Sequence, residues 1–253
     1  MYHSLNLPIE LSQQIIQKDL LKPYQIYLSL KFLHNGQVRI SDIDYQKISD
    51  LSGYKDARTI KAHLDTCLSL NWIGSDNEWY FIRSFDRLRK DIEATSRTAI
   101  EISKKDIPNL LELLLSAKIE HRARSKRYAR KKSGAKPETI EPNSDFSGNG
   151  NDFGLYKVSC SLIADWFSFS PSTATRIKQR AKKIGYLDYI HDYKKTGLHR
   201  RNIADLSDHI EPTRLFIKNG QICIRLTDRF IITGEHHIYK FKSRKSIELQ
   251  NVQ

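Results

Sequence analysis

The sequence predicts an α+β fold that is mainly helical and in which one order of elements occurs twice. Two observations support this prediction. Apolar residues recur at helical spacing in several segments, and short strand-like segments lie between them. The same order of segments is found in residues 1–96 and again in residues 97–253. We therefore expect two domains with these boundaries.

The first three segments of the two halves match in order. In the first half they are LPIELS (7–12), the apolar PYQIYLSLKFL (23–33) and QVRIS (37–41). In the second half they are TAIEIS (98–103), the apolar IPNLLELLLSAKIE (107–120) and YKVS (156–159). We expect strands at the short segments and helices at the apolar ones. Residues 133–154 interrupt the second half and hold four of the 11 glycines and two of the 7 prolines, which predicts a flexible loop.

Two helices joined by a tight turn are predicted next in the first half. The segment DYQKISDLSGY (44–54) suits a short helix that ends at Gly53. A second helix is expected over residues 56–73, with Asp56 as its N-cap. Its apolar stripe consists of Ile60, Leu64, Cys67 and Leu68.

The second half carries the same pair of helices. A short helix is expected over residues 161–169, with Ile163, Trp166 and Phe167 facing inward. The next helix begins with Ser170 as N-cap and Pro171 at the first position, where the missing N–H costs nothing. Its apolar stripe consists of Ala174, Ile177, Ala181 and Ile184. Two such helices joined by a tight turn form a helix-turn-helix.

A β-hairpin is predicted after each pair of helices. Residues 72–83 hold two aromatic-rich segments around a polar turn. Residues 213–226 hold Asn219-Gly220 between alternating apolar runs, which is the strongest short hairpin signal. A last strand is expected within residues 236–244. Helix, strand, helix, helix and hairpin is the order of a winged helix-turn-helix, here repeated.

Composition and charge point to a folded protein with a polyanionic partner. The 253 residues are 39% hydrophobic and 28% charged, and the formal net charge is +13. A basic protein with no nucleic-acid role is the alternative. Cys67, Cys160 and Cys223 lie far apart without a CxxC pair, so we expect neither a zinc ribbon nor a disulfide framework. With no signal peptide and no apolar stretch of ~20 residues, a soluble, cytoplasmic protein is expected.

The predicted helix that begins at Ser170 has the composition of a DNA-recognition helix. An α-helix fits the major groove, where residues near its N-terminus contact base edges and later cations contact phosphates. The candidates for base contacts are Ser172, Thr173, Arg176 and Gln179, and Arg180 projects from the same side. The candidates for phosphate contacts are Lys178, Lys182 and Lys183. The alternative is a solvated face that only keeps the helix soluble.

Three further groups of residues could contact DNA. The basic run 118–132 includes Arg122, Arg124, Lys126 and Arg127, and it could be a helical extension along phosphates, a disordered arm or a solvated segment. A wing or wing-adjacent loop could use Lys194, Lys195, Arg200 and Arg201. The matching helix of the first half offers Lys55, Arg58, Thr59 and Lys61, either for weak DNA contacts or for a protein interface.

In this order of elements the chain resembles tandem winged-helix proteins, above all the plasmid replication initiators whose two winged-helix domains are related by pseudo-twofold symmetry. It is also similar, less specifically, to winged-helix regulators of phages and mobile elements. The resemblance implies that the second domain's recognition helix enters the major groove, through Thr173, Arg176, Lys178, Gln179, Arg180 and Lys183. It also implies that the first domain aids dimerisation or contacts DNA, so that a homodimer is a candidate assembly. The insert at 133–154 departs from the compact pattern of the family.

No catalytic motif was found in the sequence. A P-loop signature is absent, and the adjacent His236-His237 lacks the His-x-His spacing of nicking relaxases. We therefore expect that the protein is not an enzyme and that it binds no cofactor, no metal and no small-molecule substrate. The leading hypothesis is sequence-specific binding of double-stranded DNA in replication initiation of a plasmid, phage or mobile element. The alternatives are a transcriptional regulator of the same architecture and a protein-interaction or structural component without DNA readout.

Overall fold

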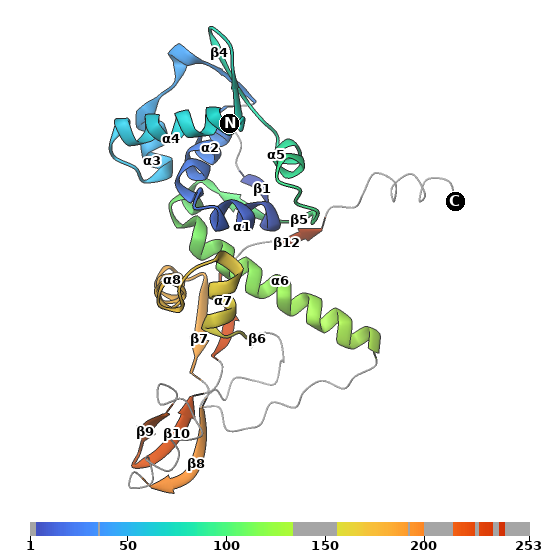
Figure 1. Cartoon of the computed structure of the whole chain (residues 1–253), viewed down its shortest axis with the longest axis vertical. Helices are drawn as coiled ribbons and strands as arrows, with labels where there is room; N and C mark the ends of the chain where they lie inside the picture. The colour runs from blue at the N-terminus through green and yellow to red at the C-terminus, as the bar shows by residue number, and fades with distance from the viewer. Residues whose placement is uncertain are drawn as a thin grey trace, which may run out of the picture.

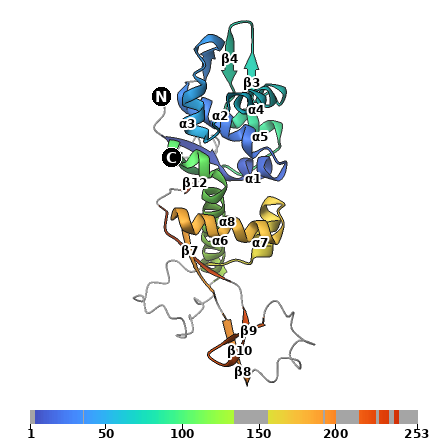
Figure 2. The ribbon, with the colours of Figure 1, turned by 90° about the vertical axis from the view of Figure 1, so that its left-hand side faces the viewer.

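The computed structural model describes residues 4–34, 36–133, 156–191, 193–199, 215–225, 228–234 and 238–240, and it shows helices packed with small antiparallel sheets (Figure 1). Within these residues the strands form four three-stranded sheets, with the orders β1-β5-β12, β2-β4-β3, β6-β11-β7 and β8-β10-β9. The elements of the first half lie at one end of the elongated protein, and β8, β9 and β10 lie at the other (Figures 1 and 2). The predicted mixed helix and strand content is confirmed.

The first half contains five α-helices, one 3-10 helix and four strands among the described residues. Its first three elements are β1 (Ser4–Pro8), α1 (Ile9–Gln17) and α2 (Leu21–Leu33). Then follow β2 (Gln37–Arg39), the 3-10 helix η1 (Ile40–Asp42), α3 (Tyr45–Ser52), α4 (Ala57–Ser69), β3 (Ile73–Ser75), β4 (Trp79–Ile82) and α5 (Phe85–Asp91).

Local capping explains the predicted turn between α3 and α4. Gly53 ends α3 in the left-handed conformation with φ 81°, which a residue with a side chain adopts only at a cost. Asp56 then caps α4 by accepting a hydrogen bond from the backbone N–H of Arg58 at 3.0 Å. Three residues of the predicted stripe of α4, Ile60, Leu64 and Cys67, are buried, whereas Leu68 is half-buried. The turn and the N-cap are confirmed, but the helix ends at Ser69, before the predicted end at residue 73.

The second half begins with a strand that pairs with the start of the chain. It contains β5 (Thr98–Ser103), the 3-10 helix η2 (Lys104–Asn109), α6 (Leu110–Ser133), β6 (Tyr156–Lys157), α7 (Cys160–Phe167), α8 (Pro171–Ile184) and β7 (Leu187–Ile190). It continues with β8 (Tyr193–His199), β9 (Leu215–Lys218), β10 (Gln221–Arg225), β11 (Arg229–Ile232) and β12 (Ile238–Lys240).

The order of elements recurs as predicted, but with a different second hairpin. The first half has the order β2, α3, α4, β3 and β4, and the corresponding elements of the second half are β6, α7, α8, β7 and β11. The two sheets also have the same strand order, with β4 in the centre of one and β11 in the centre of the other. Asn219 and Gly220 do form a turn, with φ of 52° and 75°. However, their hairpin belongs to the separate sheet β8-β10-β9. The hairpin of the repeated unit is therefore β7 with β11, and residues 191–228 are inserted between its strands.

One further segment differs from the predictions. The segment LPIELS is not a strand throughout, because the strand ends at Pro8 and α1 begins at Ile9. TAIEIS is the strand β5, and it pairs with β1, which lies mostly before LPIELS. The two strands are antiparallel, and Leu7 lies opposite Ile100. The predicted last strand is β12, which extends this sheet on the other side of β5. The predicted loop 133–154 lies outside the described residues except for Ser133, the last residue of α6.

One continuous hydrophobic core joins the two halves. α2 lies within it, and Tyr24, Tyr27 and Phe32 are fully buried. The start of α6 contributes Leu110, Leu113, Leu114, Leu115, Ala117 and Ile119. Polar contacts also cross between the halves, since the side-chain amide of Gln17 donates to the backbone oxygen of Trp166 at 3.1 Å. The core therefore places α7 and α8 against α1 and α6. The boundary between domains at residue 97 stays a prediction.

Candidate nucleic-acid interface

The helix α8 is capped and amphipathic, as predicted. The Ser170 hydroxyl accepts a hydrogen bond from the backbone N–H of Thr173 at 3.2 Å, and Gly185 ends the helix with φ 92°. Ala174, Ile177 and Ala181 are buried in the contacts of α8 with α6 and α7. Ile184 is instead 40% exposed, because it lies in the last turn of the helix, beyond the packed surface. Its assignment to the buried stripe was wrong.

The opposite side of α8 is exposed and rich in polar and cationic groups. Thr173 is half-buried, and its hydroxyl accepts a hydrogen bond from Nη2 of Arg176 at 3.2 Å. This contact holds the guanidinium of Arg176 against the first turn of α8. The exposed residues of the predicted interface on α8 are Ser172, Arg176, Gln179, Arg180, Lys182 and Lys183. Figure 2 shows α8 from the side, with the first half on one side of it and β7 on the other.

Lys178 does not belong to this surface. Its side chain is only 2% exposed, and its ammonium forms an ion pair with the carboxylate of Asp228 and lies 4.3 Å from the ring centre of Tyr189. A lysine buried between α8 and the β7–β11 hairpin cannot reach a phosphate. The predicted phosphate contact of Lys178 is therefore wrong.

Two other cations of α8 are paired with carboxylates. Nε of Arg180 lies 2.9 Å from Oε1 of Glu112 in α6, and Nζ of Lys182 lies 2.5 Å from Oδ1 of Asp188 in β7. The hydrogen bond to Asp188 raises the pKa of Lys182, and the same bond lowers the pKa of the aspartate. Lys178, Arg180 and Lys182 each form an ion pair, which offsets their positive charge. In the described part of the chain, the cations of α8 without an ion pair are therefore Arg176 and Lys183.

A groove of about 500 Å³ adjoins the exposed side of α8. Its walls come from α8, from the α1–α2 corner, and from α6 and the turn before α8. They consist of Thr173, Arg176, Ile177, Arg180, Ile16, Asp19, Leu21, Leu111 and Phe169. The first half of the protein therefore borders the surface that carries Arg176, so a molecule bound along α8 would also meet the α1–α2 corner.

The matching helix of the first half presents a smaller cationic surface. Lys55, Arg58 and Lys61 are exposed at the start of α4. Thr59 is half-buried, and its hydroxyl donates to Oδ2 of Asp56 at 3.2 Å. Asp56, the N-cap of α4, therefore places a carboxylate among these cations, which makes this surface less positive than that of α8.

The basic run after residue 118 is helical as far as α6 extends, which favours the helical alternative over a disordered arm. Arg124 forms an ion pair with Glu120 one turn earlier. Arg122 is half-buried, with its guanidinium 5.8 Å from the ring centre of Trp166. Two of the predicted contacts, Lys126 and Arg127, lie on α6, but their side chains are outside the described residues.

The insertion between β7 and β11 carries the remaining predicted contacts. Lys195 is exposed on β8. Lys194 lies on the same strand, with its side chain outside the described residues. Arg200 and Arg201 are themselves outside them. The described strands β8, β9 and β10 contain lysine and arginine but no aspartate or glutamate, so this sheet adds positive charge at the far end of the protein (Figure 1).

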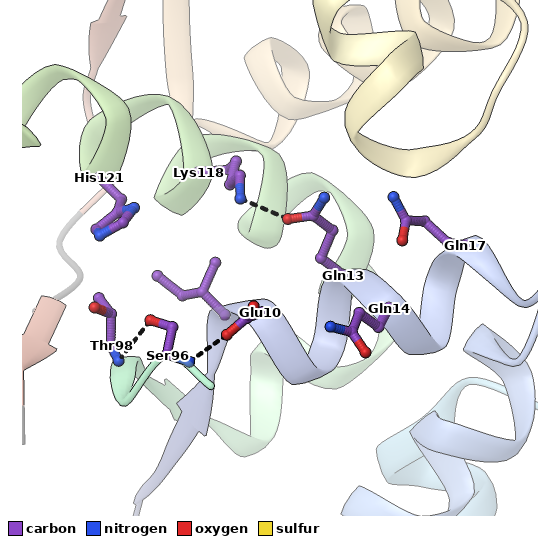
Figure 3. Close-up of a pocket in the computed structure, with 9 residues that line it drawn as sticks. Glu10, Gln13, Gln14, Gln17, Ser96, Thr98, Lys118 and His121 are labelled. Atoms are coloured by element: carbon purple, nitrogen blue, oxygen red, sulfur yellow. Dashed lines mark hydrogen bonds between the residues drawn. The ribbon is translucent and has the colours of Figure 1, made fainter. Parts of the chain in front are cut away.

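A second cavity, of about 340 Å³, lies between α1, α6 and the start of β5 (Figure 3). Several of its polar side chains form hydrogen bonds with neighbouring side chains or backbone groups. Glu10 accepts a hydrogen bond from the backbone N–H of Ser96, and Lys118 donates to Oε1 of Gln13 at 2.5 Å. Burial lowers the pKa of Lys118. Nowhere in the described residues do three His, Cys, Asp or Glu side chains gather to hold a metal ion.

Comparison with known proteins does not assign the chain to a family. No protein-family model matches the sequence, and neither curated proteins nor solved structures gave a significant match. Among the described helices, none is both long and apolar enough to cross a membrane.

Proposed function

We propose that this chain is a sequence-specific double-stranded DNA-binding protein with two winged helix-turn-helix units. One unit is β2, α3, α4, β3 and β4, and the other is β6, α7, α8, β7 and β11. In each, two helices joined by a tight turn precede a hairpin that completes a three-stranded sheet, and this arrangement supports the assignment. In this proposal α8 is the recognition helix of the second unit and enters the major groove.

The observation that carries the proposal is the exposed side of α8. Ser172, Arg176 and Gln179 are exposed on a helix whose other side is packed into the core. Arginine can bind guanine through two hydrogen bonds, and glutamine can bind adenine in the same way. Lys183, one turn later, suits a phosphate contact. The net charge of +13 supplies the long-range attraction that a polyanion requires.

The other cationic surfaces would extend the contact. Lys195 on the inserted sheet would contact the DNA backbone beyond the site of α8. Arg58 and Lys61 on α4, with Lys55 just before this helix, would give the first unit a weaker contact. We propose replication initiation of a plasmid, phage or mobile element as the process, because two units in one chain suit a long, asymmetric repeated site. Transcriptional regulation through the same units is the alternative.

Selection of binding sites from random duplexes at ~150 mM salt tests the proposal, since weak electrostatic contacts fade at this ionic strength. We expect a defined sequence to be enriched. Direct repeats that melt on binding would favour initiation, and a single palindrome would favour transcriptional regulation. Loss of all DNA at this salt concentration would contradict DNA binding and favour a protein-interaction role.

A further inference from the structure

Three side chains connect α8 with the base of the inserted segment 191–228. Asp228 directly precedes β11, and His191 directly follows β7. One oxygen of Asp228, Oδ2, forms an ion pair with Nζ of Lys178 in α8, and the other, Oδ1, lies 2.8 Å from Nδ1 of His191. We call these three residues the neck network, because they lie where the two strands of the hairpin continue into the insertion.

The neck network is buried at its centre. Lys178 is 2% exposed and Asp228 is 6% exposed. The ammonium of Lys178 also lies 3.7 Å from the sulfur of Cys160, at the start of α7, and near the ring of Tyr189 in β7. Lys178 of α8 thus contacts both α7 and the β7–β11 hairpin. These contacts add to the packing of α8 against α6 and help to set how α8 is oriented in the second unit.

Stability alone does not account for a buried ion pair at this position. Removing two charges from water has a large free-energy cost, and apolar side chains of similar volume are often as stabilising or more so. Lys178 also occupies the position that completes the packed side of α8 with Ala174, Ile177 and Ala181, where an apolar residue is the usual choice. What an ion pair adds is direction, because hydrogen bonds restrict the relative orientation of the groups that form them.

The direction is relevant to DNA binding because Arg176 lies two residues before Lys178, about 200° around the helix. Fixing Lys178 on the inner side therefore fixes the rotation at which Arg176 and Gln179 project on the outer side. Since Asp228 also holds His191, the same carboxylate fixes where the insertion leaves the hairpin.

We propose that the neck network positions α8 and the inserted sheet relative to each other, and that Asp228 is a specificity-determining residue although it does not touch DNA. This inference rests on the proposed DNA-binding function. It predicts that the network affects the preference for the selected sequence more than the general affinity for DNA.

The sharpest test is the double variant Lys178→Met/Asp228→Leu, which leaves the net charge unchanged. Affinities for the selected duplex and for random duplexes are measured by fluorescence anisotropy, and thermal unfolding shows that the variant is folded. We expect affinity for the selected duplex to fall roughly tenfold, comparable to one mismatched base pair, with little change for random duplexes. A folded double variant with wild-type preference would overturn the inference while leaving the proposed function in place.

A matched pair of single variants gives a second test with an opposite sign. Asp228→Asn and Asp165→Asn each remove one negative charge, and Asp165 is exposed on α7. Simple electrostatics predicts that both bind all DNA slightly more tightly. We expect Asp228→Asn instead to weaken binding to the selected duplex severalfold, whereas Asp165→Asn does not. Equal behaviour of the two variants would overturn the inference, and a wild-type protein without sequence preference would overturn both the inference and the proposed function.

Discussion

Arg176→Ala isolates the proposed base contact from every other cation. Arg176 is exposed, has no ion pair among the described residues and contacts the hydroxyl of Thr173 in the preceding turn. Because nothing in the core depends on it and alanine favours helix, we expect the free energy of unfolding to change by less than about 0.5 kcal/mol. If the guanidinium binds a guanine, affinity for the selected duplex should fall by about 1–3 kcal/mol, or roughly 5- to 150-fold.

Lys183→Ala is the matched control for this measurement. It removes the same charge from the same exposed side of α8, at a residue that also lacks an ion pair in the described part of the chain. A phosphate contact should weaken binding to all sequences alike and reduce the slope of log K against log salt by about 0.9. Titration of selected and random duplexes at several salt concentrations separates the two effects. If Arg176→Ala weakened both duplexes equally, the assignment of Arg176 to base readout would be refuted.

Three further predictions concern the fold that holds α8. Ser170→Ala should destabilise the protein by about 1 kcal/mol in thermal or urea unfolding, because the N-cap bond to the first turn of α8 is lost; an unchanged midpoint would contradict the cap. Cys160 is half-buried, whereas Cys67 and Cys223 are fully buried and burial raises the pKa of Cys67 to about 12, so a thiol reagent at pH 8 should modify one cysteine of the native protein; rapid reaction of all three would contradict the packing. Burial raises the pKa of Asp228, but the hydrogen bonds from Lys178 and His191 outweigh it, so the folded pKa lies below the unfolded value; the stabilisation should be complete above pH ~4 and be lost as the pH falls further, and Asp228→Asn should lack this acid-dependent part.

The local elements of this fold could be predicted from the sequence because their signals are local. Asp56 and Ser170 cap their helices, Gly53 ends α3, and Asn219-Gly220 forms a hairpin turn. Each depends on the backbone preferences of a few adjacent residues. The recurring order of elements followed from these signals.

The pairing of strands could not be predicted in the same way. The Asn219-Gly220 hairpin is the strongest local signal, yet β7 pairs with β11, whose first residue is 39 positions after the last residue of β7 (229 − 190 = 39). Which distant strand completes a sheet depends on packing across the whole unit, and short runs such as RFII do not encode it. The match of IELS with IEIS was accidental, because Pro8 ends the strand and the residues that follow have helical spacing.

Lys178 was wrongly predicted to belong to the candidate interface, although its position in the helix indicates burial. Residues 174, 177, 178 and 181 have the spacing of the packed side of a helix, and this pattern could have indicated that Lys178 is buried. Its charge suggested the opposite. The partner that makes burial possible, Asp228, is 50 residues away in the sequence, so no local pattern reveals it. Arg176 and Gln179 were assigned to the exposed side by the same periodicity, and there the structure agrees.

The most direct test of the central claim asks which groove of the DNA the exposed side of α8 contacts. Methylation of guanine at N7 changes the major groove, whereas methylation of adenine at N3 changes the minor groove. On the selected duplex we expect N7 methylation at one or more guanines to block binding of the wild-type protein, and the effect at one of these guanines to disappear for Arg176→Ala. Interference only at adenine N3, or an N7 pattern identical in both proteins, would contradict the claim that Arg176 and its neighbours bind base edges in the major groove.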